Sequence, residues 1–205
     1  AVQIRHGGCG YMASRRIERL ASDTPFQSSS SGIDLTVTDF WSWAGSDLLD
    51  NSLRGQLAEF IVGSALGCVD GKVRREWDAY DLLTPDGIKV EVKSTAYLQA
   101  WGPTTKSSIK FSVGKSRAWD AETNTYDVEH KRSSDVYVFC YFACEDRKVA
   151  NPLNLDQWEF YVVPTSLLEK LIPEQKSISL TSLLRLTSAP RVAHADIAEA
   201  VRGRK

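Results

Sequence analysis

Residues 77–99 read WDAYDLLTPDGIKVEVKSTAYLQ, and this stretch decides the fold expected of the chain. Pro85-Asp86-Gly87 suits a three-residue hairpin loop, a type I turn closed by a glycine in the left-handed conformation. The flanking segments, Trp77–Leu83 and Ile88–Thr95, are rich in apolar and β-branched residues and are predicted to be strands. The stretch therefore predicts a β-hairpin.

The turn also determines which residues face each other. With Pro85–Gly87 as the loop, Asp81 lies opposite Glu91. Cross-strand partners point to the same side of a sheet and alternate residues share a face, so Asp81, Glu91 and Lys93 are expected to emerge together. The opposite face is almost wholly apolar and is expected to pack on the core; it carries Tyr80, Leu82, Ile88, Val90 and Val92.

The hydrophobic pattern supports this register independently of the turn. A slip of one residue would bury the charged side chains and expose the apolar ones. The same alternation rejects Asp78, which lies three residues before Asp81 and points to the other face. Asp86 is explained by turn chemistry. Asp81 is therefore the only acidic residue of the first strand predicted to face Glu91.

Two carboxylates directly across a hairpin lie about 5 Å apart at Cβ. Like charges that close raise each other's pKa and repel unless a cation lies between them. Mg²⁺ suits this position, because it takes oxygen ligands and keeps other positions for water and substrate phosphate. Such an ion makes a bound water nucleophilic, and Lys93 can hold a phosphate oxygen or orient that water. Asp81 and Glu91 are therefore candidate metal ligands.

The bare Asp/Glu-x-Lys triplet carries little weight by itself. It occurs five times, beginning at Asp70, Glu91, Glu129, Asp146 and Glu174. Only the triplet at Glu91 lies in an apolar strand with an Asp facing it across a turn. The alternative is a plain surface hairpin whose charges form an exposed cluster of Glu91, Lys93 and Lys89.

A helix is predicted over Ser52–Leu66. Its apolar residues recur at helical spacing and make one stripe, formed by Leu53, Leu57, Phe60, Ile61 and Ala65. Gly67 follows as a stop signal. Gly55 and Gly63 either weaken this helix or allow a neighbour to pack closely.

The remaining elements alternate along the chain. Further strands are predicted at Ile109–Val113, Val136–Phe142 and Trp158–Val163. The second reads VYVFCYF, the continuous apolar run of a strand buried on both faces. Short helices are predicted at Ile17–Ala21, Ser166–Leu171 and His194–Val201, and Leu35–Trp43 is predicted to be a strand or a substrate-facing loop. This order predicts an α/β (α+β) fold with a central mixed sheet flanked by helices.

The length of 205 residues suits a single domain overall, with an N-terminal segment over residues 1–50, partly loop, and a domain over residues 51–205. The net charge of -1 gives no global basic excess, so local charge matters more than the total. The four cysteines form no CxxC pair, and Cys140 and Cys144, in or beside an apolar strand, are expected to be small buried hydrophobes. This usage suits a reducing cytoplasm. No run approaches ~18 apolar residues, so no membrane span is expected.

The hairpin and the helix before it resemble the PD-(D/E)XK nuclease superfamily, which has the restriction-endonuclease-like fold. That pattern is a helix with an acidic residue, then a hairpin with Asp on its first strand and Glu-x-Lys on its second. Glu59 matches the helical acid, Asp81 the hairpin Asp, and Glu91 with Lys93 the Glu-x-Lys. The likeness runs from about Asn51 to Gln99. Tyr80, rather than the family's Pro, precedes Asp81.

The resemblance implies a function and a cofactor. Asp81, Glu91 and the Val92 carbonyl would hold Mg²⁺, for which Mn²⁺ can substitute; Lys93 would serve the attacking water; and Glu59 would hold a second metal or a metal-bound water. The expected enzyme is a metal-dependent deoxyribonuclease, an endonuclease of restriction, phage-defence, repair or mobile-element type. DNA is the expected partner. A homodimer is one arrangement that the protein itself can adopt. The alternative is a non-catalytic DNA-binding or protein-interaction module that retains this fold.

Four further residues are candidate substrate contacts. Gln99 shares the alternation of Glu91 if the strand stays extended. Lys110, Lys115 and Arg117 belong to a basic run, which also includes Lys106 and lies near Trp101 and Trp119; this composition suits contacts to a nucleic-acid backbone. An ordinary solvated face explains the same run, and a polar strand end explains Gln99 equally well.

Overall fold

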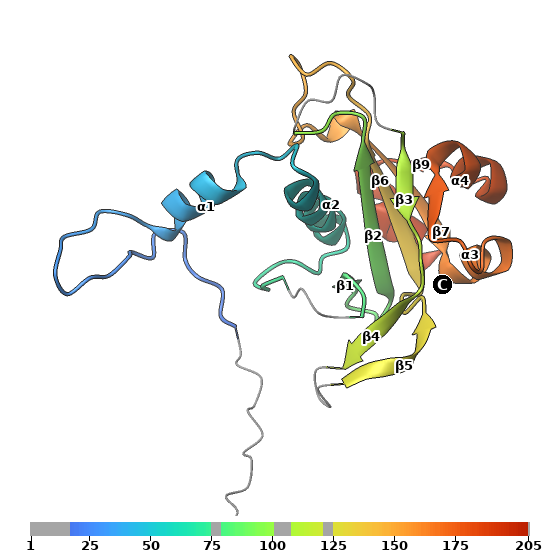
Figure 1. The fold of residues 1–205 in the computed structure, drawn as a ribbon, viewed down its shortest axis with the longest axis horizontal. Helices are drawn as coiled ribbons and strands as arrows, with labels where there is room; N and C mark the ends of the chain where they lie inside the picture. The colour runs from blue at the N-terminus through green and yellow to red at the C-terminus, as the bar shows by residue number, and fades with distance from the viewer. Residues whose placement is uncertain (1–16, 75–78, 101–107, 121–124, 205) are drawn as a thin grey trace, which may run out of the picture.

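The computed structural model describes residues 17–74, 79–100, 108–120 and 125–204, which form a mixed α+β fold around a five-stranded sheet (Figure 1). The strand order is β1 (Leu82–Leu83), β2 (Lys89–Ala96), β6 (Val136–Phe142), β7 (Trp158–Pro164) and β9 (Arg191–Val192). β2 and β6 run parallel, and the other neighbouring pairs run antiparallel. The predicted central mixed sheet is therefore confirmed.

The other described elements surround this sheet. Two small antiparallel sheets pair β3 (Lys110–Ser112) with β8 (Ser177–Ser179), and β4 (Ser116–Asp120) with β5 (Thr125–Lys131). The helices are α1 (Val37–Gly45), α2 (Asn51–Ala65), α3 (Thr165–Leu171), α4 (Leu180–Thr187) and α5 (Ile197–Arg202), with short 3₁₀ turns η1 (Leu155–Gln157) and η2 (His194–Asp196). Among the described residues, no helix is long and apolar enough to cross a membrane.

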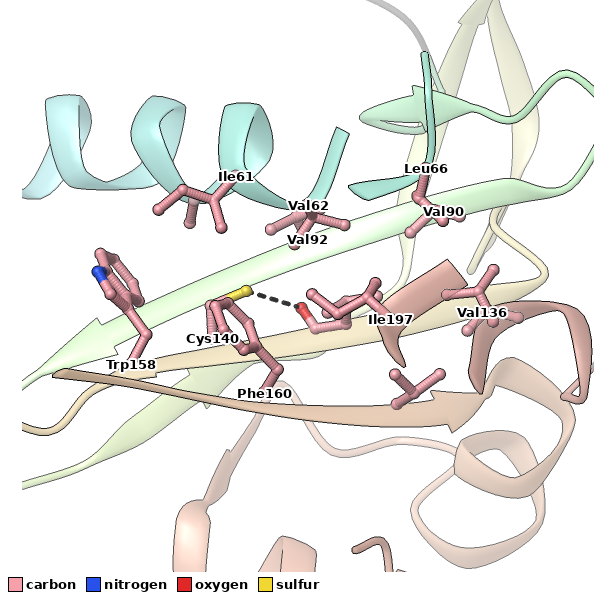
Figure 2. Packing of buried hydrophobic residues seen from close by; sticks show 14 of the residues in the cluster. Ile61, Val62, Leu66, Val90, Val92, Val136, Cys140, Trp158, Phe160 and Ile197 are labelled. Atoms are coloured by element: carbon pink, nitrogen blue, oxygen red, sulfur yellow. Dashed lines mark hydrogen bonds between the residues drawn. The ribbon is translucent and has the colours of Figure 1, made fainter. Parts of the chain in front are cut away.

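The core has two layers, one on each face of the sheet. On one face, α2 and α5 pack against alternate residues of β2, β6 and β7, and Figure 2 shows Ile61, Val62 and Ile197 meeting Cys140 and Phe160 there. On the other face, the remaining residues of β6 and β7 pack against β3, β8, α3 and α4. All seven residues of β6 are buried, as its continuous apolar run predicts, and Cys140 behaves as a small buried hydrophobe.

The predicted helix over Ser52–Leu66 is confirmed as α2. The Asp50 side chain caps it by accepting hydrogen bonds from the first backbone N–H groups, and Gly67 follows its end with a φ of +67°. The predicted apolar stripe is wrong at Phe60, which is 60% exposed, whereas Ala58 and Val62 are buried. The face that packs on the sheet is thus rotated from the one that the stripe indicated.

The N-terminal region departs from the sequence predictions. Leu35–Trp43, predicted as a strand or a substrate-facing loop, instead forms most of α1, because Thr36 and Asp39 form a capping box that starts a helix. Ile17–Ala21 forms no helix. Figure 1 shows α1 beyond α2, outside the layers of the core, and only Val37 of this helix is buried.

Several short elements have no clear signal in the sequence. The strands β4 and β5 form a hairpin that projects from the sheet (Figure 1), and Val128 within it is 85% exposed, so this apolar residue does not join the core. The elements β8, α4 and β9 have two to eight residues each. Short segments of this kind are stabilised by tertiary packing rather than by their own periodicity. The predicted helices at Ser166–Leu171 and His194–Val201 are confirmed as α3 and α5.

Candidate active site

The hairpin register is the one that the turn predicts. Leu82 pairs with Val90, and Leu83 pairs with Lys89. The Thr84 N–H donates to the Ile88 carbonyl at 3.0 Å, and Gly87 closes the loop with a φ of +85°. The first strand is shorter than predicted, because regular pairing covers only Leu82 and Leu83 among the described residues.

Asp81 lies directly before the first residue of this short strand. Its N–H still donates to the Val90 carbonyl at 3.1 Å, but at the next rung its carboxylate replaces the backbone, accepting the Val92 N–H at Oδ2 over 2.7 Å. The N–H and C=O of one strand residue point to the same side, so the Val92 carbonyl also points to this edge. Asp81 therefore lies at the edge of β2 rather than fully on one face.

The predicted place of Tyr80 on the apolar face is wrong. Its ring lies 5.5 Å from the Lys89 ammonium, a cation–π contact, and Lys89 alternates with the buried Val90. The physical reason is that β1 begins only at Leu82, so the alternation does not apply to earlier residues. Asp78 lies outside the described residues.

Glu91 and Lys93 form an ion pair on the face of β2 opposite α2. The Lys93 Nζ lies 2.5 Å from Glu91 Oε1, and both side chains are largely shielded from solvent. Burial disfavours the charged ammonium, but Glu91, Asp81 and Glu59 outweigh it and raise the pKa of Lys93 above its ordinary value. Lys93 therefore carries its positive charge at neutral pH.

Asp81 is the most perturbed carboxyl group of this site. Burial and the neighbouring Glu91 raise its pKa to about 7, with a smaller contribution from Glu59, while the Val92 N–H and Lys93 oppose the shift. Its pKa thus lies close to neutral pH, a property typical of functional carboxyl groups and of sites that gain from added positive charge.

Glu59 approaches the hairpin from the other face, on α2. Its carboxylate is held by Arg74, whose Nε lies 2.5 Å from Oε2 and whose second terminal nitrogen lies 2.8 Å from Oε1. One helical turn after Glu59, Gly63 lies so close to Val69 and Leu82 that a Cβ there would clash with the Val69 side chain. This close approach brings α2 against Leu82, the first residue of β1, which directly follows Asp81.

The carboxylates of Glu59, Asp81 and Glu91 differ in their surroundings, and these surroundings bear on whether they can bind a divalent metal ion. Within the described residues, no three His, Cys, Asp or Glu side chains converge closely enough to hold a metal. Glu59 is paired with Arg74, and Glu91 with Lys93. The donor chemistry nevertheless fits Mg²⁺, because carboxylate and carbonyl oxygens are its preferred protein ligands, and burial together with Glu91 raises the pKa of Asp81 despite the nearby Lys93.

The candidate substrate contacts are dispersed. Gln99 follows the end of β2 instead of extending it, and its amide donates to the Ala96 carbonyl. Lys110 is exposed on β3. Lys115 pairs with Glu174 at 2.8 Å. Arg117 lies on the β4–β5 hairpin and donates to the backbone of β5. Their roles toward a substrate remain predictions; Trp101, Lys106 and the side chain of Trp119 lie outside the described residues.

Two residues near the site were not singled out by sequence reasoning. Arg74 precedes the hairpin in a polar stretch, and nothing in its local pattern indicates the contact with Glu59. Tyr137 lies beside Glu91 on the neighbouring parallel strand, and burial together with Glu91 raises its pKa to about 12. The parallel pairing of β2 with β6 is the feature that brings it there.

Most of the chain matches a known protein family. Residues 31–182 match the family model described as bacteriophage T4 endonuclease IV. The matched range covers α1, α2, the whole hairpin and the sheet through β7, so it includes Glu59, Arg74, Asp81, Glu91 and Lys93. A comparison with curated proteins gives no match.

Proposed function

Because this chain belongs to the bacteriophage T4 endonuclease IV family, and is thus a nuclease by family, we propose that it is a Mg²⁺-dependent enzyme that hydrolyses DNA phosphodiester bonds. We further propose an active site of the PD-(D/E)XK kind. The observation that supports this most is the hairpin, whose short first strand brings the Asp81 carboxylate to the edge of β2 beside Glu91 and Lys93.

Each residue has a distinct role in this proposal. Asp81, Glu91 and the Val92 carbonyl would hold the metal, and Glu59 would complete its shell or hold a second ion. The metal, when bound, supplies Lewis-acid activation of a water and charge stabilisation at the phosphate. The protein contributes a rigid arrangement, because Val92 and Glu91 lie in a strand paired on its other side with buried β6.

Lys93 acts in this proposal as a cation. Its raised pKa keeps the ammonium charged beside Glu91, so in this state it holds a phosphate oxygen or orients a water by donating hydrogen bonds. Neutralising the surrounding carboxylates would remove the cause of the raised pKa. The proton affinity of Lys93 is therefore tied to the charge state of Asp81 and Glu91.

Replacing Lys93 with Ala tests the proposal. We expect Mg²⁺-dependent cleavage of DNA to fall by about 10²-fold or more, as for loss of a positioned acid–base or charge-stabilising group, while the protein remains folded, with an unfolding temperature lowered by the loss of the partner of Glu91. Lys89→Ala is the matched control, since Lys89 lies on the same strand but is exposed and contacts Tyr80. Equal activity of both variants would remove Lys93 from the mechanism.

The alternative is a binding module that has this fold but does not cleave DNA. Assays with duplex, single-stranded and branched DNA, in Mg²⁺ and in Mn²⁺, separate the two. If the wild-type protein binds DNA yet cuts none of these substrates, the module reading replaces the enzyme. If Asp81→Asn and Glu91→Gln only stabilise the protein and leave cleavage intact, the metal role of these residues is wrong.

A further inference from the structure

Arg74 makes a two-pronged contact with Glu59 that the proposed mechanism does not use. Its Nε and a terminal nitrogen lie 2.5 and 2.8 Å from the two carboxylate oxygens. The two residues are 15 positions apart and come from different segments, α2 and the connection that follows it. Arginine suits this geometry because its planar fork matches carboxylates and phosphates equally well.

The contact competes with any metal at Glu59. A carboxylate offers about four lone-pair sites, and the arginine fork takes one on each oxygen. The Glu59 side chain is 13% exposed, so little of it remains open to solvent. A metal that takes Glu59 as a ligand must therefore share an oxygen with Arg74 or displace the guanidinium.

The two side chains of this ion pair differ in their exposure to solvent. That of Arg74 is 39% exposed, whereas Glu59 lies inward and adds to the raised pKa values of both Asp81 and Lys93. Arg74 is therefore the partner of this ion pair that is more accessible to an anion from solvent. A phosphate group of a bound nucleic acid is the competing anion that would meet it.

We propose that Arg74 contacts a substrate phosphate and that, until nucleic acid binds, it limits the binding of metal by Glu59. Without substrate, the guanidinium holds Glu59 and weakens its use as a metal ligand. A phosphate of the bound strand takes over the guanidinium and releases Glu59 to the metal. Substrate and metal then bind cooperatively, because each favours the same position of one side chain. This inference rests on the proposed function, since it assumes the metal site.

The first test measures Mn²⁺ binding to the full chain by calorimetry without nucleic acid. Arg74→Ala should bind Mn²⁺ about two- to fivefold more tightly than the wild type, the effect expected from removing one partly exposed competing ion pair. In the Glu59→Gln background, Arg74→Ala should have no such effect. Arg191→Ala is the matched control, because Arg191 pairs with Glu159 at the far edge of the sheet, and it should leave Mn²⁺ affinity unchanged.

The second test measures binding of single-stranded and duplex oligodeoxynucleotides in EDTA, where cleavage is excluded. Loss of one phosphate contact in Arg74→Ala should reduce the slope of log K against log salt by about 0.7 for single strands or about 0.9 for duplex. Arg74→Lys should keep the slope, because the ammonium still meets the phosphate, and Arg191→Ala should match the wild type.

Two results would overturn the inference. Weaker Mn²⁺ binding by Arg74→Ala would mean that Arg74 orients Glu59 as a ligand rather than withholding it. Unchanged Mn²⁺ affinity together with an unchanged salt slope would reduce the contact to a static ion pair. If the protein still cuts DNA with Mg²⁺, either result rejects this role of Arg74 and leaves the proposed function unaffected. A wild type that neither binds Mn²⁺ nor cuts DNA rejects the proposed function itself.

Discussion

At the scale of single residues, the site depends on one side chain that takes the place of a backbone carbonyl in the hydrogen-bond ladder. Just before β1 begins, the Asp81 side chain accepts the Val92 N–H that a backbone carbonyl would otherwise accept. This holds the carboxylate at the edge of β2, where the charges of Glu91 and, to a smaller extent, Glu59 act on it. A full-length first strand would have placed the Asp81 side chain on one face only.

The raised pKa of Asp81 predicts how stability depends on pH. Its folded-state pKa, about 7, lies above the ordinary value of 3.8, so the folded state favours the protonated carboxyl. The associated stability is fully present below about pH 4 and is lost as the pH rises through about 7. Asp81→Asn keeps an acceptor for the Val92 N–H and removes the charge. In metal-free buffer it should raise the thermal unfolding temperature at pH 8.

The comparison of Asp81→Asn with the wild type at low pH is the control for this prediction. Near pH 4 both proteins carry a neutral side chain at this position, so their unfolding temperatures should nearly coincide. A stabilisation of equal size at pH 4 and pH 8 would contradict the raised pKa and point to packing instead. Calorimetry across this pH range measures the difference.

At the scale of elements, α2 brings Glu59 to the hairpin because of how closely it packs. Gly63, one turn beyond Glu59, would place a Cβ against Val69 and 3.3 Å from the Leu82 side chain. Gly55, on the same helix, has open space around it. From the sequence, either glycine could weaken the helix or allow a neighbour to pack closely. Only the packing shows that Gly63 is the one with a close neighbour.

The two glycines give a matched pair of variants. Gly55→Ala should stabilise the protein by about 0.5–1 kcal/mol, because alanine favours the helix and meets no neighbour. Gly63→Ala gains the same propensity but crowds Val69 and Leu82. Overpacking typically costs about 1–3 kcal/mol, so it should destabilise the protein. Urea denaturation of both variants measures this; a stabilised Gly63→Ala would contradict the close packing.

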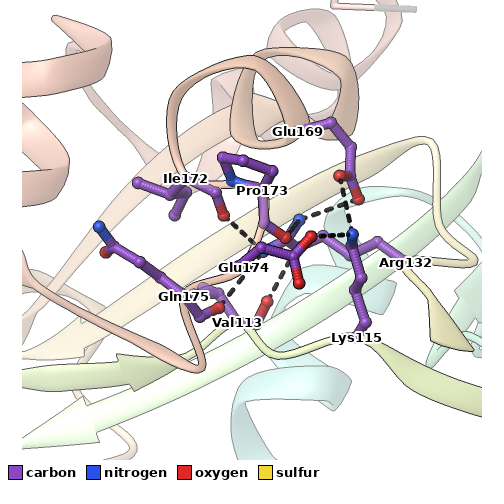
Figure 3. Close-up of polar contacts among 8 residues, drawn as sticks. All are labelled: Val113, Lys115, Arg132, Glu169, Ile172, Pro173, Glu174 and Gln175. Atoms are coloured by element: carbon purple, nitrogen blue, oxygen red, sulfur yellow. Dashed lines mark hydrogen bonds and ion pairs between the residues drawn. The ribbon is translucent and has the colours of Figure 1, made fainter.

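At the scale of the whole molecule, Arg132 ties together segments that are distant in the sequence. Its side chain is fully buried, pairs with Glu169 at 2.8 Å, and donates to the carbonyls of Val113 and Ile172. Figure 3 shows this cluster, in which Lys115 approaches Glu169 and Glu174 from the other side. The guanidinium thereby links the end of β5 to β3 and to the segment after α3.

Arg132→Met should destabilise the protein by about 3 kcal/mol, because it removes a buried cation and leaves backbone carbonyls without a donor. Lys115→Met is the control within the same cluster. Its partner Glu174 is 83% exposed, and such pairs contribute about 1 kcal/mol or less. Equal midpoints of urea denaturation for the two variants would show that burial of Arg132 adds nothing.

Much of this protein was determined by its sequence alone, where the deciding interactions are local. The Pro85-Asp86-Gly87 turn and the alternation beside it set the register that pairs Leu82 with Val90. The cap and spacing around Asn51–Ala65 produce α2, and the apolar run of Val136–Phe142 produces a buried strand. In each case, the atoms that decide lie within a few residues of one another.

Only the tertiary structure decided which distant segments meet. It placed β6 parallel to β2, began β1 only at Leu82, and brought Arg74 to Glu59. It also brought together the segments that Arg132 links, which are the end of β5, β3 and the segment after α3. The physical reason is that such contacts depend on how whole elements pack to bury apolar surface, and a local pattern records only which side of an element is apolar.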